Sequence, residues 1–330
     1  MKLSGKMSLW ALLFVSFAVG AEEVHSIVRF KYRNAEELKE AEQRATEKIK
    51  NTYETLPDVR NCQSGWLKYD EKRKALKELN AIRRAHGLEE VGYDTTRDKF
   101  TAASALIMAA NNTLTHYPDI RMKCYSKNGY EGSRNGNLHL FSAQSAVLAT
   151  DNYIEESIRE LLIDDNVISL GHRFWFLDPF LGDISYGRST DFYKTYIDSA
   201  VVYVGNQRQA VPNTKADYVA YPYKNYKSQW FMHDWFSSFS VIVDKNNPNN
   251  NLRTVDYSQA KISVSNSNGK YMKISDIKYT PINSTSVAGL GNSIQWRAIG
   301  TKNNERYYVK ISNVLVNGKL QNYDYWFEVK

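Results

Sequence analysis

Three features that would quickly assign a chain to a functional class are missing from this sequence of 330 residues. After residue 21 there is no apolar run near the roughly 20 residues that a membrane-spanning helix needs, so we expect no transmembrane anchor. The net charge is +7, but Lys and Arg do not gather into one stripe, so we expect no nucleic-acid partner. The His-Glu-x-x-His pattern of zinc peptidases is also missing.

The first 21 residues predict a secretory signal peptide. Lys2 and Lys6 form the charged start, residues 8–19 form the apolar run, and Gly20 and Ala21 are small residues at the cleavage position. We therefore expect a secreted protein that works in the extracellular space or the cell envelope.

Cysteine is scarce, with two residues in the whole chain, Cys62 and Cys124. In an oxidising compartment a disulfide is the favoured state of such a pair. The alternative is a catalytic cysteine beside a histidine. A disulfide that closes about 60 residues adds on the order of 4 kcal/mol of stability in the loop-entropy model.

Apolar residues recur at helical spacing in the first half of the chain. They predict helices over residues 34–56, 70–91, 98–117 and 151–165. The third segment is the most apolar and is expected to be buried, and His116 is expected at its frayed end, before Pro118.

Beyond residue 212 the pattern changes to strands. Apolar and polar residues alternate over 260–265, 293–299 and 307–329. Asn317-Gly318 lies between two alternating runs and is a strong hairpin signal. Several such strands predict a β-sandwich.

Two histidines, His116 and His172, each follow a predicted helix. Imidazole is the commonest metal ligand and titrates near neutral pH. Two rings with carboxylates and water are able to hold Zn²⁺. Spacing alone is weak evidence for such a zinc site, because no two potential ligands lie close together in the sequence. A structural role for both rings is the favoured alternative.

Four stretches resemble the CAP superfamily, that of cysteine-rich secretory and pathogenesis-related proteins, and especially its bacterial secreted branch. Between residues 62 and 205 they read LKELNAIRRAHGLEEVGYD, AASALIMAANNTLTHYP, CYSKNGYEGSRNGNL and DDNVISLGHRFWFLDP. The tail, through SIQWRAIG and YYVKISNVLVNGK, is similar to the β-sandwich that follows the CAP domain in some bacterial members. The resemblance implies an α+β fold, in which a CAP-type α-β-α sandwich is followed by an all-β immunoglobulin-like sandwich.

The resemblance also implies a central cleft lined by two histidines and two acidic residues, and some members bind Zn²⁺ there. His116 and His172 match the histidine positions. Gly136 stands where the family usually has a glutamate, and Glu131 is the candidate substitute. The second acid comes from the helix before the Gly-His motif, where the candidates are Glu160, Asp164 and Asp165.

Other matched positions imply structural roles. Asn80 and Arg83 match the Asn-x-x-Arg of the first family helix and are expected to be structural. Asn137, beside the cleft, is expected to satisfy backbone groups in its loop. After His172, residues 174–177 are expected to enter the core sheet.

The expected organisation is a signal peptide (1–21), a charged helical extension (22–61), a CAP domain (62–211) and a β-sandwich domain (212–330). We expect a non-enzymatic binding protein, whose partner is a small hydrophobic ligand (a sterol or fatty acid) or an extracellular protein or cell-wall component. One alternative is a zinc-assisted hydrolase or peptidase that uses His116 and His172 as metal ligands. Another is a scaffold that binds partners through the β-sandwich.

Overall fold

The computed structural model describes residues 12–17, 24–29, 35–143, 153–192, 196–205, 216–284 and 289–330. These residues form a mixed α+β fold, as expected. The boundary predicted at residue 212 and most of the predicted signal peptide lie outside the described residues. Both stay predictions.

The chain forms two compact units. The first unit consists of Met1–Lys74, Asp94–Ser157 and Ser185–Tyr203. The second unit consists of Ala75–Tyr93, Ile158–Ile184 and Val204–Lys330. The second unit therefore combines the strand-rich tail with two segments from the helical half of the chain.

All four predicted helical segments form helices. They are α1 (Ala35–Lys50), α2 (Tyr69–Ala85), α3 (Asp98–Asn111) and α5 (Tyr153–Ile163). The prediction that α3 reaches His116 is wrong. Asn112 takes a left-handed φ of 45° and its N–H bonds to the Met108 carbonyl, which ends the helix. No helix in the described part of the chain is long and apolar enough to cross a membrane.

Two shorter helices were not predicted. One is α4 (Lys127–Asn135), which begins where the Ser126 hydroxyl accepts the Gly129 N–H at 3.0 Å. The other is α6 (Gly171–Phe176), which contains most of the segment expected to enter the core sheet. That expectation is wrong, because the Leu177 N–H bonds to the Arg173 carbonyl and closes a helical turn. Six aromatic-rich residues are too few to show helical periodicity.

A four-stranded sheet has the order β5-β7-β8-β6. Neighbouring strands run antiparallel, except that β5 runs parallel to β7. The strands are β5 (Gly92–Tyr93), β6 (Gly136–Ala143), β7 (Asp183–Asp191) and β8 (Tyr196–Tyr203).

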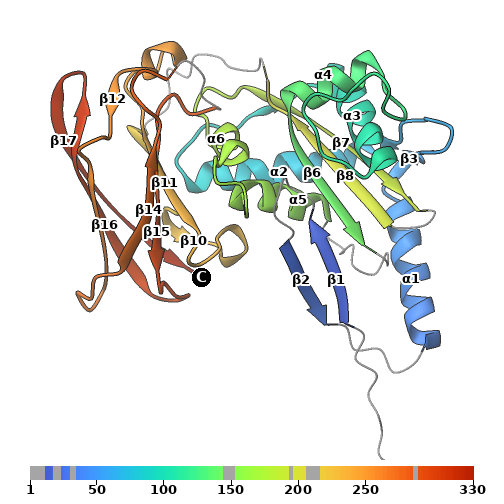
Figure 1. Ribbon diagram of the computed structural model, residues 1–330, viewed down its shortest axis with the longest axis horizontal. Coiled ribbons are helices and arrows are strands. Elements are labelled where there is room, and N and C mark those ends of the chain that lie inside the picture. Colours follow the sequence, from blue (N-terminus) through green and yellow to red (C-terminus); the bar gives the residue numbers. More distant parts are fainter. Residues whose placement is uncertain are drawn as a thin grey trace, which may run out of the picture. The chain divides into compact units, whose positions relative to one another are not determined.

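Helices flank both faces of this sheet. On one face α3 packs against β8 (Figure 1), and it lies so close to the neighbouring β7 that a Cβ on Gly187 would be 2.5 Å from the Thr101 backbone. On the opposite face the Tyr186 hydroxyl lies 3.0 Å from that of Ser157, in the first turn of α5. Adjacent residues of a strand point to opposite faces, which explains why positions 186 and 187 contact different helices.

Two strand pairs complete the described part of the first unit. The strand β3 (Tyr53–Thr55) pairs with β4 (Trp66–Leu67). The strand β1 (Leu12–Phe17) pairs with β2 (Val24–Arg29). Cleavage after Ala21, the predicted site, would remove β1.

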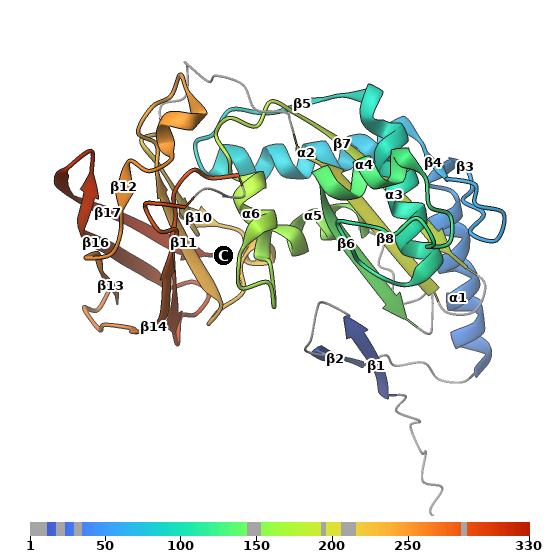
Figure 2. The same cartoon turned by 45° about the horizontal axis from the view of Figure 1, so that its top comes forward.

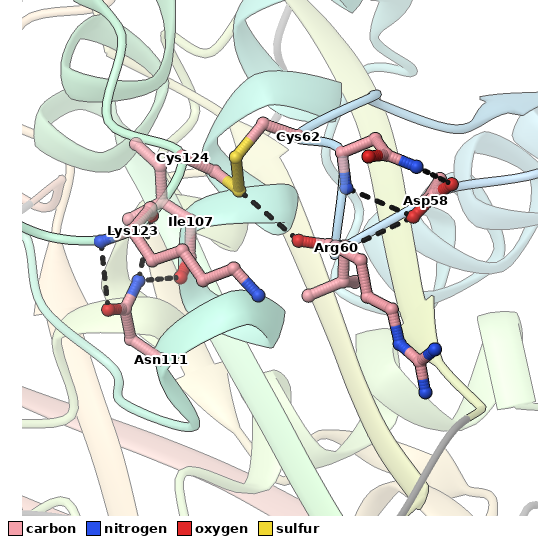
Figure 3. Close-up of a disulfide and its surroundings, with 9 residues drawn as sticks. Asp58, Arg60, Cys62, Ile107, Asn111, Lys123 and Cys124 are labelled. Atoms are coloured by element: carbon pink, nitrogen blue, oxygen red, sulfur yellow. Dashed lines mark hydrogen bonds between the residues drawn. A yellow bond between two sulfur atoms is a disulfide. The ribbon is translucent and has the colours of Figure 1, made fainter.

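The predicted disulfide between Cys62 and Cys124 is present, with the two Cα atoms 5.0 Å apart. Figure 3 shows its surroundings. The Cys124 sulfur lies 3.5 Å from the Val59 carbonyl. The Asn111 side chain, at the end of α3, donates to the Lys123 carbonyl at 2.9 Å and accepts the Lys123 N–H at 3.1 Å. The bridge therefore ties two loops together beside α3.

The tail forms two facing sheets in the second unit (Figures 1 and 2). One has the order β14-β15-β11-β9, and the other has the order β10-β17-β16-β12, with β13 also paired to β16. Inward aromatic rings join them, for example Phe239 of β11 and Tyr323 of β17 at 5.0 Å. The strands are β9 (Tyr218–Tyr221), β10 (Lys224–Tyr226), β11 (Phe236–Val241), β12 (Val255–Asp256), β13 (Lys261–Asn266), β14 (Lys273–Tyr279), β15 (Ile294–Ile299), β16 (Arg306–Val316) and β17 (Lys319–Val329).

The hairpin predicted at Asn317-Gly318 joins β16 and β17. Both residues have positive φ, 46° and 77°, as a tight antiparallel turn requires. The immunoglobulin-like character of the two sheets stays a prediction.

Candidate functional site

The His172 ring is held by a buried carboxylate. Asp164 follows α5 in a left-handed conformation, with φ 58°. Its Oδ1 accepts the Nδ1–H of His172 at 2.7 Å, and its Oδ2 accepts the Arg173 N–H at 3.0 Å. Because a carboxylate only accepts, Nδ1 of His172 carries the proton and Nε2 is the basic nitrogen.

Arg173, the charged residue that follows His172, has a structural role. Its side chain is fully buried and donates to the carbonyls of Leu162, Ile163 and Phe236 at 2.5–2.8 Å. The guanidinium also lies 3.8 Å from the centre of the Tyr221 ring. These hydrogen bonds attach the turn that contains His172 to the end of α5 and to β11.

The His116 ring is also held through its Nδ1, here by a backbone carbonyl. His116 lies in the loop after α3, and its Nδ1–H donates to the Ser133 carbonyl at 2.8 Å. The Ser133 hydroxyl lies 2.7 Å from that of Ser104 and joins α4 to α3. Nε2 is again the basic nitrogen of the ring.

Glu131 projects from α4 toward the end of β8. Its Oε1 accepts hydrogen bonds from the Asn135 amide and the Tyr203 hydroxyl, both at 3.0 Å. Arg97 donates to the same Tyr203 hydroxyl at 3.2 Å. Burial and the neighbouring Glu131 carboxylate raise the pKa of Tyr203, so the phenol stays neutral. This network orients Glu131 firmly.

Gly136 has no room for the glutamate usual in the family. A Cβ at this position would lie 2.6 Å from both the Gly132 carbonyl and a Val201 methyl. Glycine at this position therefore allows α4 and β8 to lie close together. The next residue, Asn137, is buried at the start of β6.

The acids near the end of α5 have different environments. Asp164 pairs with His172, and its side chain is fully buried. Asp165 is exposed, and partial desolvation followed by the charge of Glu160 raises the pKa of its carboxyl. Sequence reasoning had left these three acids open, because it could not see the left-handed turn that directs Asp164 toward the imidazole.

The site residues divide between the two units. His116, Glu131 and Asn137 belong to the first unit, and Glu160, Asp165 and His172 belong to the second. A shared cleft stays a prediction.

The donors in the described part of the chain do not fit a zinc site by themselves. Zinc sites use three or four protein ligands. Within the described residues, no group of three or more His, Cys, Asp or Glu side chains could hold a metal ion.

A third histidine, His86, has a structural role just after the end of α2. Its Nδ1–H donates to the Ala220 carbonyl at 2.8 Å, and its Nε2 accepts from the Tyr226 hydroxyl at 3.0 Å. Burial, together with the positive charges of Arg173 and Arg83, lowers the pKa of His86 to about 3. The ring is neutral and joins the end of α2 to the tail.

Asn80 and Arg83, expected to be structural, are buried and bonded to backbone groups. The Asn80 amide exchanges two hydrogen bonds of 2.9 Å with the backbone of Val91. The Arg83 guanidinium donates to the carbonyls of Glu89, Phe176 and Asp178, each at 2.8 Å. Both expectations are confirmed.

A pocket of about 660 Å³ opens beside the disulfide in the first unit. Its floor is α3, with Ala102, Ala103 and Leu106, and we call it the disulfide pocket. Trp66 and Ile120 stand at its rim with exposures of 38% and 76%. The remaining lining residues are Cys62, Ser64, Lys99, Met122, Cys124, Tyr125, Ser126 and Asn128. Sequence reasoning missed this pocket, because its walls come from three separate segments.

Of three comparisons with known proteins, the one with solved structures gives matches. No family model matches the chain, and no curated protein matches it. Among solved structures, the chain matches the CAP domain of enterococcal PrgA at 15% identity and a TM-score of 0.32. The match covers 56% of this chain and 83% of that one. The matched structure is thus a CAP domain, and the sequence motifs resemble the CAP superfamily.

Proposed function

We propose that this protein is an exported, non-enzymatic binding protein of the CAP type whose ligand is a small hydrophobic molecule. The disulfide pocket is the observation that carries the proposal. Its volume of about 660 Å³ falls within the range of ligand pockets, roughly 300–1,000 Å³. The disulfide itself supports an oxidising compartment.

The lining favours an acid with an apolar chain. Leu106, Ile120 and Met122 supply apolar surface, and Lys99 is the one charged residue among the lining side chains. An ammonium group at the edge of an apolar pocket pairs with a carboxylate and disfavours a cationic ligand. A fatty acid meets these requirements better than a sterol, whose hydroxyl carries no charge.

Calorimetry with palmitate and cholesterol tests this proposal on the purified protein. Lys99→Met should weaken palmitate binding about tenfold, the equivalent of 1.4 kcal/mol, and leave cholesterol binding unchanged. Ala103→Trp should block both ligands by filling the pocket. Lys123→Met is the matched control, because this exposed lysine lies outside the lining. Binding that survives Ala103→Trp, or no binding of either lipid, would contradict the proposal.

The alternative function depends on the two histidines, one in each unit. Each ring donates its Nδ1–H to a protein acceptor, so that Nε2 is the atom of the neutral ring with the chemistry of a hydrogen-bond acceptor or metal ligand. The buried Asp164 beside His172 is the kind of orienting carboxylate that metal-binding and proton-accepting histidines use. This observation keeps the zinc-assisted hydrolase as the alternative function.

A zinc titration separates the two candidates. Under the non-enzymatic proposal, we expect calorimetry on the metal-free protein to show no tight one-to-one binding of Zn²⁺. Tight binding that is lost in both His116→Ala and His172→Ala would instead support a shared metal site. Loss in one variant alone would place the metal on that ring and not on the other.

A further inference from the structure

A second pocket, of about 670 Å³, lies in the second unit. Its walls come from three places: Asp217 just before β9, the loop 242–252 after β11, and Asn317 in the β16–β17 turn. Side-chain amides dominate the lining, so we call it the amide pocket. Its principal polar side chains are those of Asp217, Asp244, Asn246, Asn249, Thr254 and Asn317.

One buried asparagine makes the main wall rigid. The Asn251 side chain accepts the N–H groups of Val243 and Asp244 at 2.7 and 3.1 Å. It donates to the carbonyls of Asp244 and Asn247 at 2.8 and 3.1 Å. Because both ends of the amide are used, the loop keeps one conformation, which lowers the entropy that a ligand must overcome.

The carboxylate of Asp244 is also fixed. It accepts the Asn250 amide at 2.6 Å and the Asn246 N–H at 2.8 Å. These bonds, that from Asn250 foremost, lower the pKa of Asp244 and keep it charged. Asp217, on the other side, pairs with Lys245 at 2.9 Å.

Several lining groups have no hydrogen-bond partner among the described residues. The side-chain amides of Asn246, Asn249 and Asn317 bond to no other described residue. All three side chains are exposed, so their amides are accessible to a ligand in the pocket.

The mixture of groups identifies the ligand chemistry. Asp244 repels an anion such as phosphate, and Asp217 and Lys245 neutralise each other as an ion pair. Amides and hydroxyls both donate and accept, and a sugar hydroxyl does the same, so each can satisfy the other. Ile242 and Leu252 add apolar surface suited to the C–H face of a sugar ring.

We propose that the amide pocket binds a short neutral oligosaccharide, with Asn246, Asn249 and Asn317 as direct hydrogen-bonding partners. The proposal is independent of the hydrophobic ligand in the first unit. It concerns a different unit, different residues and a ligand of opposite polarity.

Calorimetry on the purified protein with cellotriose, chitotriose and maltotriose tests the proposal. We expect at least one of these trimers to bind, and Asn249→Ala to weaken that binding about tenfold, the effect of one lost hydrogen bond. Asn225→Ala is the matched control, because Asn225 is an exposed asparagine of β10 in the same unit and does not line the pocket.

Asn246→Ala distinguishes binding from folding. Asn246 is exposed and its side-chain amide bonds to no described residue, so the change should leave the midpoint of urea unfolding unchanged while it weakens sugar binding. Loss of stability without loss of binding would overturn the assignment of Asn246. Failure of all three trimers, unchanged binding in Asn249→Ala, or tighter binding of an anionic galacturonate trimer would overturn the proposal.

Discussion

The two units bury arginine in different ways. In the first unit Arg188 of β7 pairs with Asp198 of β8, and their side chains are 2% and 0% exposed. Tyr196 donates to the same carboxylate at 2.6 Å. In the second unit the guanidinium groups of Arg83 and Arg173 donate to backbone carbonyls instead.

The difference is visible in the acid–base behaviour of the three groups. Burial alone lowers the pKa of Arg188, but attraction to Asp198 outweighs burial and raises it. Burial lowers the pKa of Arg83 to about 10, and it also lowers the pKa of Arg173. The comparison teaches that a carboxylate neutralises the buried charge in one unit, whereas oriented peptide dipoles stabilise it in the other.

Breaking the ion pair should give the largest effect. We expect Arg188→Met to lower the free energy of unfolding by about 3–5 kcal/mol, because it leaves the buried Asp198 without its counter-charge. Urea unfolding measures this loss. The double variant Arg188→Met, Asp198→Leu should recover most of it, since it removes both charges. A double variant as unstable as the single one would mean that packing, and not charge, dominates.

Removing Arg173 should cost somewhat less. Arg173→Met leaves the carbonyls of Leu162, Ile163 and Phe236 without this donor but leaves no unpaired acid, so we expect a loss of about 2–4 kcal/mol. Arg173→Lys should recover only part of it, because an ammonium lacks the planar fork that reaches several carbonyls. Full recovery by lysine in urea unfolding would show that charge alone is required.

The burial of His86 beside Arg173 and Arg83 should make the stability of the protein depend on pH. The pKa of His86 is about 3 in the folded protein, below its ordinary 6.5. The unfolded chain therefore binds the proton more readily between these values. Stability from this group is complete above pH 6.5 and falls by up to about 1.4 kcal/mol per pH unit as the pH drops toward 3. His86→Gln should remove this slope in urea unfolding measured across the range, and parallel slopes for the two proteins would contradict the prediction.

An exposed ion pair should give the smallest effect. Arg84 and Glu90 form a salt bridge whose side chains are 55% and 54% exposed. Solvent and salt screen such a pair, so Arg84→Ala should change the free energy of unfolding by about 0.5 kcal/mol or less. A change as large as that of Arg188→Met would contradict the view that burial determines the cost.

Much of the architecture could be predicted from local patterns. The helices α1, α2, α3 and α5 follow from apolar spacing, and the Asn317-Gly318 hairpin follows from turn chemistry. The pairing of Cys62 with Cys124 follows because there are only two cysteines and a predicted export signal. The short helices α4 and α6 were missed, since few residues give no periodic signal.

The candidate sites were predicted less completely, because they depend on contacts between distant segments. The sequence by itself determined which residues are able to do chemistry: His116, His172 and the acids at the end of α5. Only the tertiary structure decided that Asp164 holds His172, and that Gly136 excludes a side chain. It alone also decided where two pockets open. The physical reason is that local propensity acts over a few neighbouring residues, whereas a hydrogen bond or a pocket wall joins segments that only folding brings together.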